Sequence, residues 1–169
     1  MGAESDHSWV PAGDLSASQA TECEPGSLVF WTDKDGRSVS CGIVFGWPFG
    51  NDQLTYIFVV RSPQRPIGTV IEAKDFRRPV AALAIRPRID VDFERVSQGL
   101  GGVGSAVFRV DGNVALVGQY STPARQMFAL IDPASWTAQE GYDADGCPVP
   151  WRLSISLGIS ETFILPVGA

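Results

Sequence analysis

Alternation of apolar and polar residues is the clearest structural signal along this chain. It is most regular in WRLSISLGIS at residues 151–160, where an apolar residue occupies every second position. Neighbouring side chains of a β-strand point to opposite faces, so this period predicts a strand with one buried face. The predicted inner face consists of Trp151, Leu153, Ile155, Leu157 and Ile159.

Shorter alternating or uniformly apolar segments predict further strands. QLTYIFVV at residues 53–60 is apolar on both faces at its end, which is typical of a central strand. In the segment 39–45, the side chains of Val39, Cys41, Ile43 and Phe45 would share one face. The other predicted strands are residues 28–31, 67–73 and 88–96.

Two segments are less regular. Residues 75–87 fit either a helical turn or a strand, because Pro79 and Pro87 limit the length of any helix. Residues 132–142 predict one helical turn, with Asp132 as its N-cap and Pro133 at its first position. Neither segment indicates a long helix.

A short pattern occurs twice in the chain. GSLVF at residues 26–30 and GSAVF at residues 104–108 are each followed by an Asp-Gly pair and a second strand, which reaches Gly42 or Gly118. Asp-Gly favours a tight hairpin turn because glycine readily adopts a positive φ. The pattern predicts two hairpin units, which arise either from internal duplication or from the chance similarity of glycine-bounded hairpins.

These elements predict an all-β protein of antiparallel strands, arranged as two small barrel-like units or as one sandwich. The expected parts are an extended acidic N-terminal arm at residues 1–25, a first β unit at 26–96, a Gly-rich linker at 97–103 and a second β unit at 104–169. The two units either stand apart or pack together as one domain.

Charge is distributed unevenly along the chain. The formal net charge is −6, which argues against a general nucleic-acid-binding protein, since neutralising phosphates needs a basic surface. Residues 1–25 carry five carboxylates and no lysine or arginine, whereas residues 61–95 carry seven arginines and Lys74 against five carboxylates. The sequence therefore predicts an acidic arm and a mildly basic middle.

Cysteine usage and hydropathy suggest a location. The three cysteines, at positions 23, 41 and 147, are odd in number and widely spaced, so they predict neither a disulfide framework nor a zinc site. The sequence shows no secretory signal pattern and no apolar segment near the ~18 residues that span a bilayer. We expect a protein with reduced thiols, in the cytoplasm or in an assembly formed there, and no membrane partner.

Most catalytic chemistries lack the residues that they need. Cys41 has no apparent base, because the one histidine is His7 in the arm, so Cys41 is expected to be a buried structural thiol. DKDG at 33–36 and DADG at 143–146 lack the later glutamate of a calcium loop and predict turns. GLGGVG at 99–104 precedes a strand rather than the helix that binds a dinucleotide. We expect no enzyme activity, no cofactor and no metal.

An acidic stripe is the first candidate interaction surface. Asp90, Asp92 and Glu94 would lie on one face of the strand at 88–96, with Ile89, Val91 and Phe93 on the other. This stripe is either a solvated face, a docking site for a basic partner surface, or a carboxylate pair for glycoside hydrolysis. The last option would need an aromatic groove, for which four tryptophans are available, although core packing is their usual role: Trp31, Trp47, Trp136 and Trp151.

A group of arginines in proline-containing segments is the second candidate. Arginine is favoured at protein interfaces because its planar guanidinium binds a carboxylate through two hydrogen bonds. The group either provides solubility and pairs with the acidic arm, or binds an acidic protein partner, including the arm of another copy. Its members are Arg61, Arg65, Arg77, Arg78, Arg86 and Arg88.

These observations favour a non-catalytic protein that acts through protein–protein contacts. The leading hypothesis is a structural or accessory subunit of a larger assembly such as a phage particle, whose partner is a protein or further copies of itself. The alternative hypothesis is a small acidic inhibitor or immunity protein that blocks a toxin or an enzyme. A carboxylate-based hydrolase is the distant alternative.

Overall fold

Strands dominate this protein, which we describe from a computed structural model. The structure describes residues 15–32, 36–49, 51–83, 86–98, 102–141, 146–156 and 162–165. Within these ranges the helical elements are short 3₁₀ turns, namely η1 (Ala20–Glu22), η2 (Ala73–Asp75) and η3 (Phe93–Arg95). The predicted all-β class is therefore confirmed.

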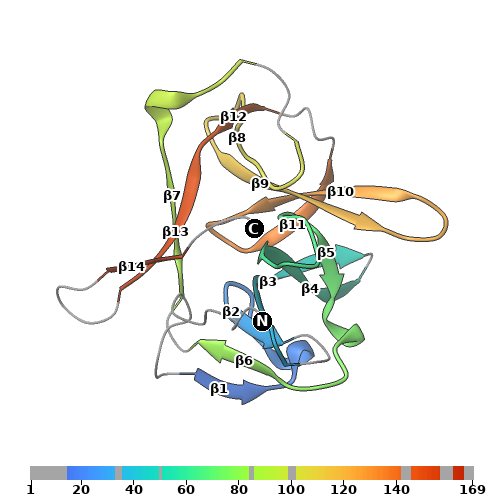
Figure 1. Cartoon of the computed structure of the whole chain (residues 1–169). Coiled ribbons are helices and arrows are strands. Elements are labelled where there is room, and N and C mark those ends of the chain that lie inside the picture. Colours follow the sequence, from blue (N-terminus) through green and yellow to red (C-terminus); the bar gives the residue numbers. More distant parts are fainter. Residues whose placement is uncertain are drawn as a thin grey trace.

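The strands belong to two sheets. An 11-stranded mixed sheet has the order β1-β6-β2-β3-β11-β10-β9-β8-β12, with β4 and β5 branching from β3, and a 3-stranded sheet has the order β14-β13-β7 (Figure 1). This pairing does not support two barrel-like units, one of the two arrangements that the sequence predicted. The strands are β1 (Leu15–Ser18), β2 (Leu28–Thr32), β3 (Val39–Phe49), β4 (Asp52–Arg61), β5 (Val70–Glu72), β6 (Val80–Leu83), β7 (Arg88–Val91), β8 (Ala106–Phe108), β9 (Val114–Ser121), β10 (Gln126–Asp132), β11 (Thr137–Gly141), β12 (Cys147–Val149), β13 (Trp151–Ser156) and β14 (Thr162–Leu165).

Most strands that the alternating pattern predicts are present. β2, β3, β4 and β5 occupy the predicted segments, and β4 lies between β3 and β5, which confirms its central position. In the segment 75–87, η2 ends at its first residue and β6 follows at Val80–Leu83, so the strand alternative is correct for that part of the segment. β13 begins at Trp151 with Leu153 and Ile155 buried as predicted, whereas residues 157–160 lie outside the described residues.

The strand predicted at residues 88–96 is wrong beyond Val91. β7 ends there and η3 follows, because the Asp92 carboxylate accepts a hydrogen bond from the backbone N–H of Glu94 at 3.2 Å. Such a local side-chain bond competes with the strand ladder. Phe93, predicted to share a strand face with Ile89 and Val91, lies in η3 instead, is 55% exposed, and lies edge-on to Phe108 with ring centroids 5.6 Å apart.

Two connecting segments also differ from the simplest expectation. The second part of the expected arm is ordered, since β1 pairs with β6 and Ala20 of η1 is buried; residues 1–14 lie outside the described residues. The helical turn predicted in residues 132–142 is instead a non-helical turn over residues 133–136, in which the Asp132 carboxylate accepts from the N–H of Ala134 and the Asp132 carbonyl accepts from the N–H of Trp136. β11, which follows this turn, was not predicted.

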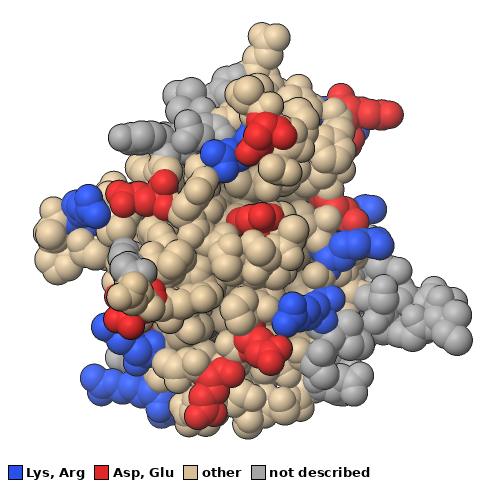
Figure 2. All heavy atoms as spheres, turned by 180° about the vertical axis from the view of Figure 1, so that it is seen from behind, with Lys and Arg blue, Asp and Glu red and all other residues tan. Residues whose placement is uncertain are grey.

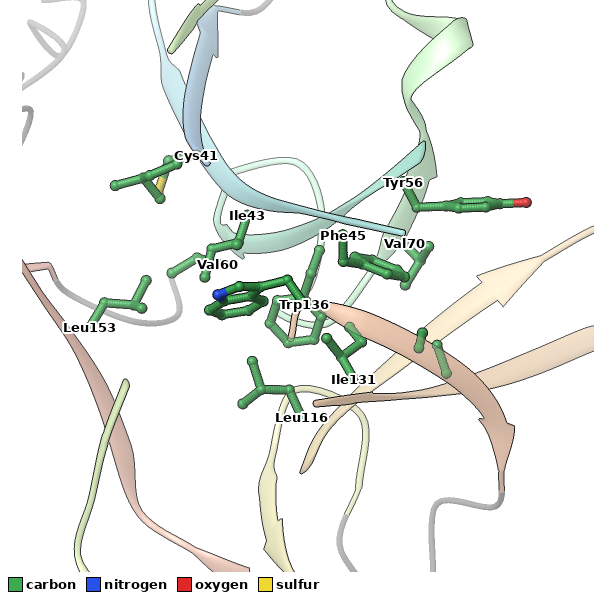
Figure 3. Packing of buried hydrophobic residues seen from close by; sticks show 14 of the residues in the cluster. Cys41, Ile43, Phe45, Tyr56, Val60, Val70, Leu116, Ile131, Trp136 and Leu153 are labelled. Atoms are coloured by element: carbon green, nitrogen blue, oxygen red, sulfur yellow. The ribbon is translucent and has the colours of Figure 1, made fainter. Parts of the chain in front are cut away.

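The main core draws on both hairpin units. Cys41, Ile43 and Phe45 of β3 belong to one buried cluster, as the two-residue period predicts, and this cluster also includes Leu116 of β9 and Trp136 (Figure 3). All five are at most 5% exposed. Because residues more than seventy positions apart share this cluster, neither hairpin buries its inner face without the other.

The repeated sequence pattern has a counterpart in the backbone. Gly26 and Gly104, which open the two GS motifs, adopt φ values of +91° and +87°. Each glycine donates its N–H to a carbonyl on the second strand of its own unit, and the residue that carries this carbonyl donates back to the serine after the glycine. The paired bonds are Gly26 to Val44 (2.7 Å) with Val44 to Ser27 (2.9 Å), and Gly104 to Val117 (2.8 Å) with Val117 to Ser105 (2.9 Å).

A segment of each unit also pairs with the second strand of the other unit, at an equivalent position. β11 pairs in parallel with β3, and the N–H of Gly46 donates to the carbonyl of Trp136 at 2.9 Å. In the other direction, the chain just ahead of β5 bridges in parallel to β9, and the N–H of Gln119 donates to the carbonyl of Gly68 at 2.9 Å. Trp136 and Gly68 both have positive φ, at 54° and 89°. We call these two contacts the reciprocal crossings.

The opening glycines sit directly against the crossings. A Cβ atom at Gly26 would lie 2.7 Å from Cδ1 of Trp136, and one at Gly104 would lie 2.8 Å from the carbonyl oxygen of Ile67. Both positions therefore require glycine for two reasons, the positive φ and the close approach of the neighbouring residue.

We predict that Gly104→Ala destabilises the protein more than Gly112→Ala. Gly112 has a similar φ of +85°, but a Cβ there meets nothing within 4 Å. Gly112→Ala should cost about 1–2 kcal/mol for the left-handed backbone alone. Gly104→Ala adds a clash with backbone and should cost about 2–4 kcal/mol. Urea unfolding measures both values, and equal losses would contradict the crowding at the crossing.

Candidate binding groove

A groove of about 740 Å³ opens where three segments meet. These are the end of β2, the residues that follow β4, and the chain from β5 through η2 to the start of β6. They are adjacent because β2 pairs with β6 through Val29–Ala82 and Phe30–Ala81. The pairing brings the residue after Phe30 beside the chain that enters β6.

An aromatic pair provides the apolar surface of this groove. Trp31 and Phe76 are half-buried, and their rings meet edge-on with centroids 5.2 Å apart. Both pack against a buried cluster that includes Val29, Val44 and Ile57. The pair is thus fixed from below while part of its surface stays accessible.

Three of the six candidate arginines line this groove. Arg65, Arg77 and Arg78 are exposed, and within the described part of the chain no carboxylate forms an ion pair with them. One carboxylate, Asp75, shares the lining, which leaves an excess of two positive charges. The groove is therefore positively charged, although the net charge of the whole chain is −6.

Basic side chains are visible on this part of the surface. Figure 2 shows them gathered at the lower left, on the side of the molecule that carries η2 and the chain leading into β6. Neighbouring guanidinium groups repel one another, and a bound anion removes that repulsion. The arrangement therefore favours a ligand with more than one negative charge.

The loops of the groove are held by local hydrogen bonds and prolines. Ser62 is buried, and its hydroxyl accepts from Ser40 at 2.9 Å and from the N–H of Gln64 at 3.2 Å. On the other side, Phe76 donates its N–H to the carbonyl of Ala73 at 3.2 Å, and Pro79 fixes the chain before β6. These hydrogen bonds and Pro79 restrict the backbone on both sides of the groove.

The other three candidate arginines lie elsewhere. Arg86 pairs with Glu24 at 3.2 Å, and Arg88 pairs with Asp90 at 3.0 Å. Arg61 ends β4 opposite Cys41, and its side chain is half-buried. The structure thus divides the group into groove residues and residues that interact within the chain.

The acidic stripe does not have the predicted geometry, because its members do not share one strand face. Asp90 accepts from Arg88, accepts from Ser154 at 2.8 Å and lies 3.9 Å from Nε of Arg152. Asp92 caps η3 and lies 3.5 Å from Nε of Arg95. Glu94 is exposed within η3. Asp90 and Asp92 are thus engaged by donors of the same chain.

Sequence reasoning missed the aromatic part of the groove. The sequence leaves two roles open for Trp31, an aromatic groove or core packing, and does not place it beside the arginines. Trp47 and Trp136 pack in the core at 2% and 5% exposure. Trp31 lies on the opposite face of β2 from Leu28 and Phe30, which face the main core. The available signal was the FRR sequence at residues 76–78, an aromatic residue directly before two arginines.

Cys41 is a buried thiol, as predicted. It is 0% exposed, and burial raises the pKa of its thiol to about 12, which nearby Arg61 only partly offsets. A thiol with such a pKa is protonated at neutral pH and is a poor nucleophile. By contrast, Cys147 is exposed on β12.

A polar cluster of Glu72, Lys74 and Tyr120 joins the two units. Tyr120 of β9 donates a hydrogen bond to Glu72 of β5, and Nζ of Lys74 lies 2.9 Å from the other carboxylate oxygen. Burial alone would raise the pKa of Glu72, but the hydrogen bonds from Tyr120 and Lys74 together hold it below its usual value. The ring of Tyr120 also meets Tyr56 edge-on, with centroids 5.3 Å apart. This cluster reinforces the reciprocal crossing next to it.

Comparisons with known proteins found no match to this chain. No protein-family model, no curated protein and no solved structure matches the chain. Among the described residues, no three histidine, cysteine or acidic side chains are grouped closely enough to hold a metal ion. The described part of the chain also contains no helix with the length and hydropathy to cross a membrane. DKDG and DADG fall largely outside the described residues, although Gly36 and Gly146 have positive φ.

We predict that Cys41 does not react with thiol reagents in the folded protein. Cys147→Ser should remove the fastest phase of reaction with a disulfide reagent at pH 8, because Cys147 is exposed. Cys41→Ser should leave the native reaction unchanged and remove one thiol only after unfolding. Rapid modification of Cys41 in the native protein would contradict its assignment as a structural residue.

We predict that Glu72 makes stability depend on pH in the acidic range. Because the fold lowers its pKa, its contribution is complete above the ordinary value of 4.5 and is lost as the pH falls through the folded value. Glu72→Gln should flatten this part of the stability curve. Tyr120→Phe should lower the free energy of unfolding at neutral pH by about 1–2 kcal/mol. The exposed Glu140→Gln, which removes the same charge outside this cluster, is the control.

Proposed function

We propose that this chain is a non-catalytic protein-binding subunit of a larger assembly formed in the cytoplasm. The groove holds an acidic segment of a protein partner. The observation that carries this proposal is the convergence of Arg65, Arg77 and Arg78 beside the Trp31–Phe76 pair, with no ion pair to them in the described part of the chain. Aromatic residues and arginine are the residue types that dominate protein-binding sites.

The groove supports a specific kind of protein ligand. An apolar side chain of the partner would pack on Trp31 and Phe76, while its carboxylates would take hydrogen bonds from the surrounding guanidinium groups. Polyanionic ligands in general would satisfy the charge alone. The net charge of −6 disfavours a nucleic acid, whose phosphates would be repelled by the remaining surface, whereas a short acidic peptide contacts only the groove.

The same reasoning supports a binding role rather than catalysis. Arginine stays protonated at all ordinary pH values, so these side chains provide charge and hydrogen bonds but no proton transfer. The one histidine of the chain, His7, lies outside the described residues. Cys41 is protonated and enclosed.

The test compares tagged variants expressed in the native host. Arg77→Glu with Arg78→Glu should reduce the recovered partner at least about tenfold, because attraction in the groove becomes repulsion. Arg95→Glu with Arg125→Glu is the matched control, since both residues are exposed, lie outside the groove lining and give the same change in net charge. Quantitative mass spectrometry after cross-linking measures the recovery.

Two results would refute the proposal. One is a partner that remains bound to the groove variant in full amount. The other is a wild-type chain that migrates alone in native extracts under gentle, low-salt conditions.

A further inference from the structure

The N-terminal segment of the chain has the composition that the groove favours. Residues 1–14, MGAESDHSWVPAGD, contain three carboxylates and no lysine or arginine. Trp9 and Val10 form an apolar pair with Glu4 and Asp6 before them and Asp14 after them. An apolar centre flanked by carboxylates is complementary to an aromatic pair flanked by arginines.

The direction of β1 determines whether residues 1–14 can reach the groove of their own chain or the groove of a second copy more directly. β1 pairs antiparallel with β6, so that Leu15 lies opposite Leu83 and Ser18 lies opposite Val80. Val80 follows Arg78 and Pro79, which line the groove. Ser18 at the end of β1 therefore lies near the groove, and Leu15 at its start lies farther away. Residues before Leu15 therefore start away from the groove of their own chain and would have to reverse direction to enter it.

The outer edge of β1 offers a route to a second copy. Within the described residues β1 pairs only with β6 and ends the order of the large sheet. Ser16 and Ala17 are exposed, and the strand has neither the lysine nor the proline that commonly protects a sheet edge. Two such edges can pair in antiparallel fashion about a two-fold axis, which forms a closed dimer.

Antiparallel pairing of β1 with its copy would solve the problem of direction. The start of β1 in one copy would then lie beside the end of β1 in the other, which is the end next to the groove. A segment of fourteen residues spans up to about 46 Å when extended, which is ample for this short path.

We propose that two copies of this chain associate through β1, and that residues 1–14 of each copy occupy the arginine groove of the other. This inference rests on the proposed function, because it takes the groove to be a site for acidic protein segments. It names the occupant as a second copy of the same chain.

The decisive experiment is a complementation of charge reversals in the full-length chain. The arm variant carries Glu4→Arg and Asp6→Arg, and the groove variant carries Arg77→Glu and Arg78→Glu. Sedimentation equilibrium of the wild type should show a dimer that weakens as salt is added. Each variant alone should dimerise at least about a hundredfold more weakly, because both symmetric contacts are then repulsive.

Mixing the two variants should restore dimers, since in the mixed pair both arms meet grooves of opposite charge. A dimer that is unaffected by either variant, or a mixture that stays monomeric, would overturn the inference. Ala17→Lys provides an independent variant, because a charge on the β1 edge should weaken the dimer without altering the arm or the groove.

A labelled peptide of residues 1–14 separates this inference from the proposed function. If the peptide binds the wild type but not the groove variant, while the full chain is monomeric, the groove takes acidic segments and the dimer inference is wrong. If the peptide does not bind and the chain is monomeric, the dimer inference is also wrong. The proposed function then depends only on whether the groove variant loses its partner in the native host.

Discussion

The reciprocal crossings are the constraint on which the rest of this fold depends. Each hairpin unit accepts, alongside its second strand, a segment that belongs to the other unit. The segment arrives with a positive φ and packs against the glycine that opens the accepting unit, as Trp136 does on Gly26. A side chain at these glycines would separate strands that share one core. Both units therefore need glycine at positions 26 and 104 to adopt this geometry.

This architecture explains where binding chemistry can and cannot occur. The inner faces of both units are used for packing, with Cys41 and Phe45 in the same apolar cluster as Leu116. Polar groups that are drawn inward, such as Ser62 and Glu72, find partners within the chain. Uncompensated charge is left to the loops around the sheets. The groove lies between such loops, where prolines and a buried hydroxyl pair replace regular structure as the source of rigidity.

The sequence predicted the strands whose own residues alternate, and missed those that depend on a distant neighbour. β3 and β13 follow from periodicity alone, and β4 follows from a short run that is apolar on both faces. β11 has the sequence TAQEG, which shows little pattern, and it becomes a strand because it lies between β10 and β3. Likewise, the sequence singled out six arginines but not the three that converge. Their convergence depends on the pairing of β2 with β6, and no local pattern encodes that pairing.

Internal symmetry gives the repeated pattern a physical meaning. Two GS motifs that resemble each other in five letters also share backbone dihedral angles, hydrogen bonds and the way each meets the opposite unit. Chance similarity of two hairpins would explain the letters and the turns, but not matching contacts between units. The two units thus share these backbone contacts in addition to the repeated letters, and the groove is lined by residues of the first unit.

The position of Trp136 also has a consequence for how the chain reaches its folded state. This side chain completes the packing above Gly26, which precedes it by 110 positions. The first unit cannot complete this packing until the segment around Trp136 has been synthesised. The packing is therefore expected to form slowly, as for other β topologies dominated by distant contacts. Until then the apolar surface beside Gly26 stays exposed to chaperones and to neighbouring chains.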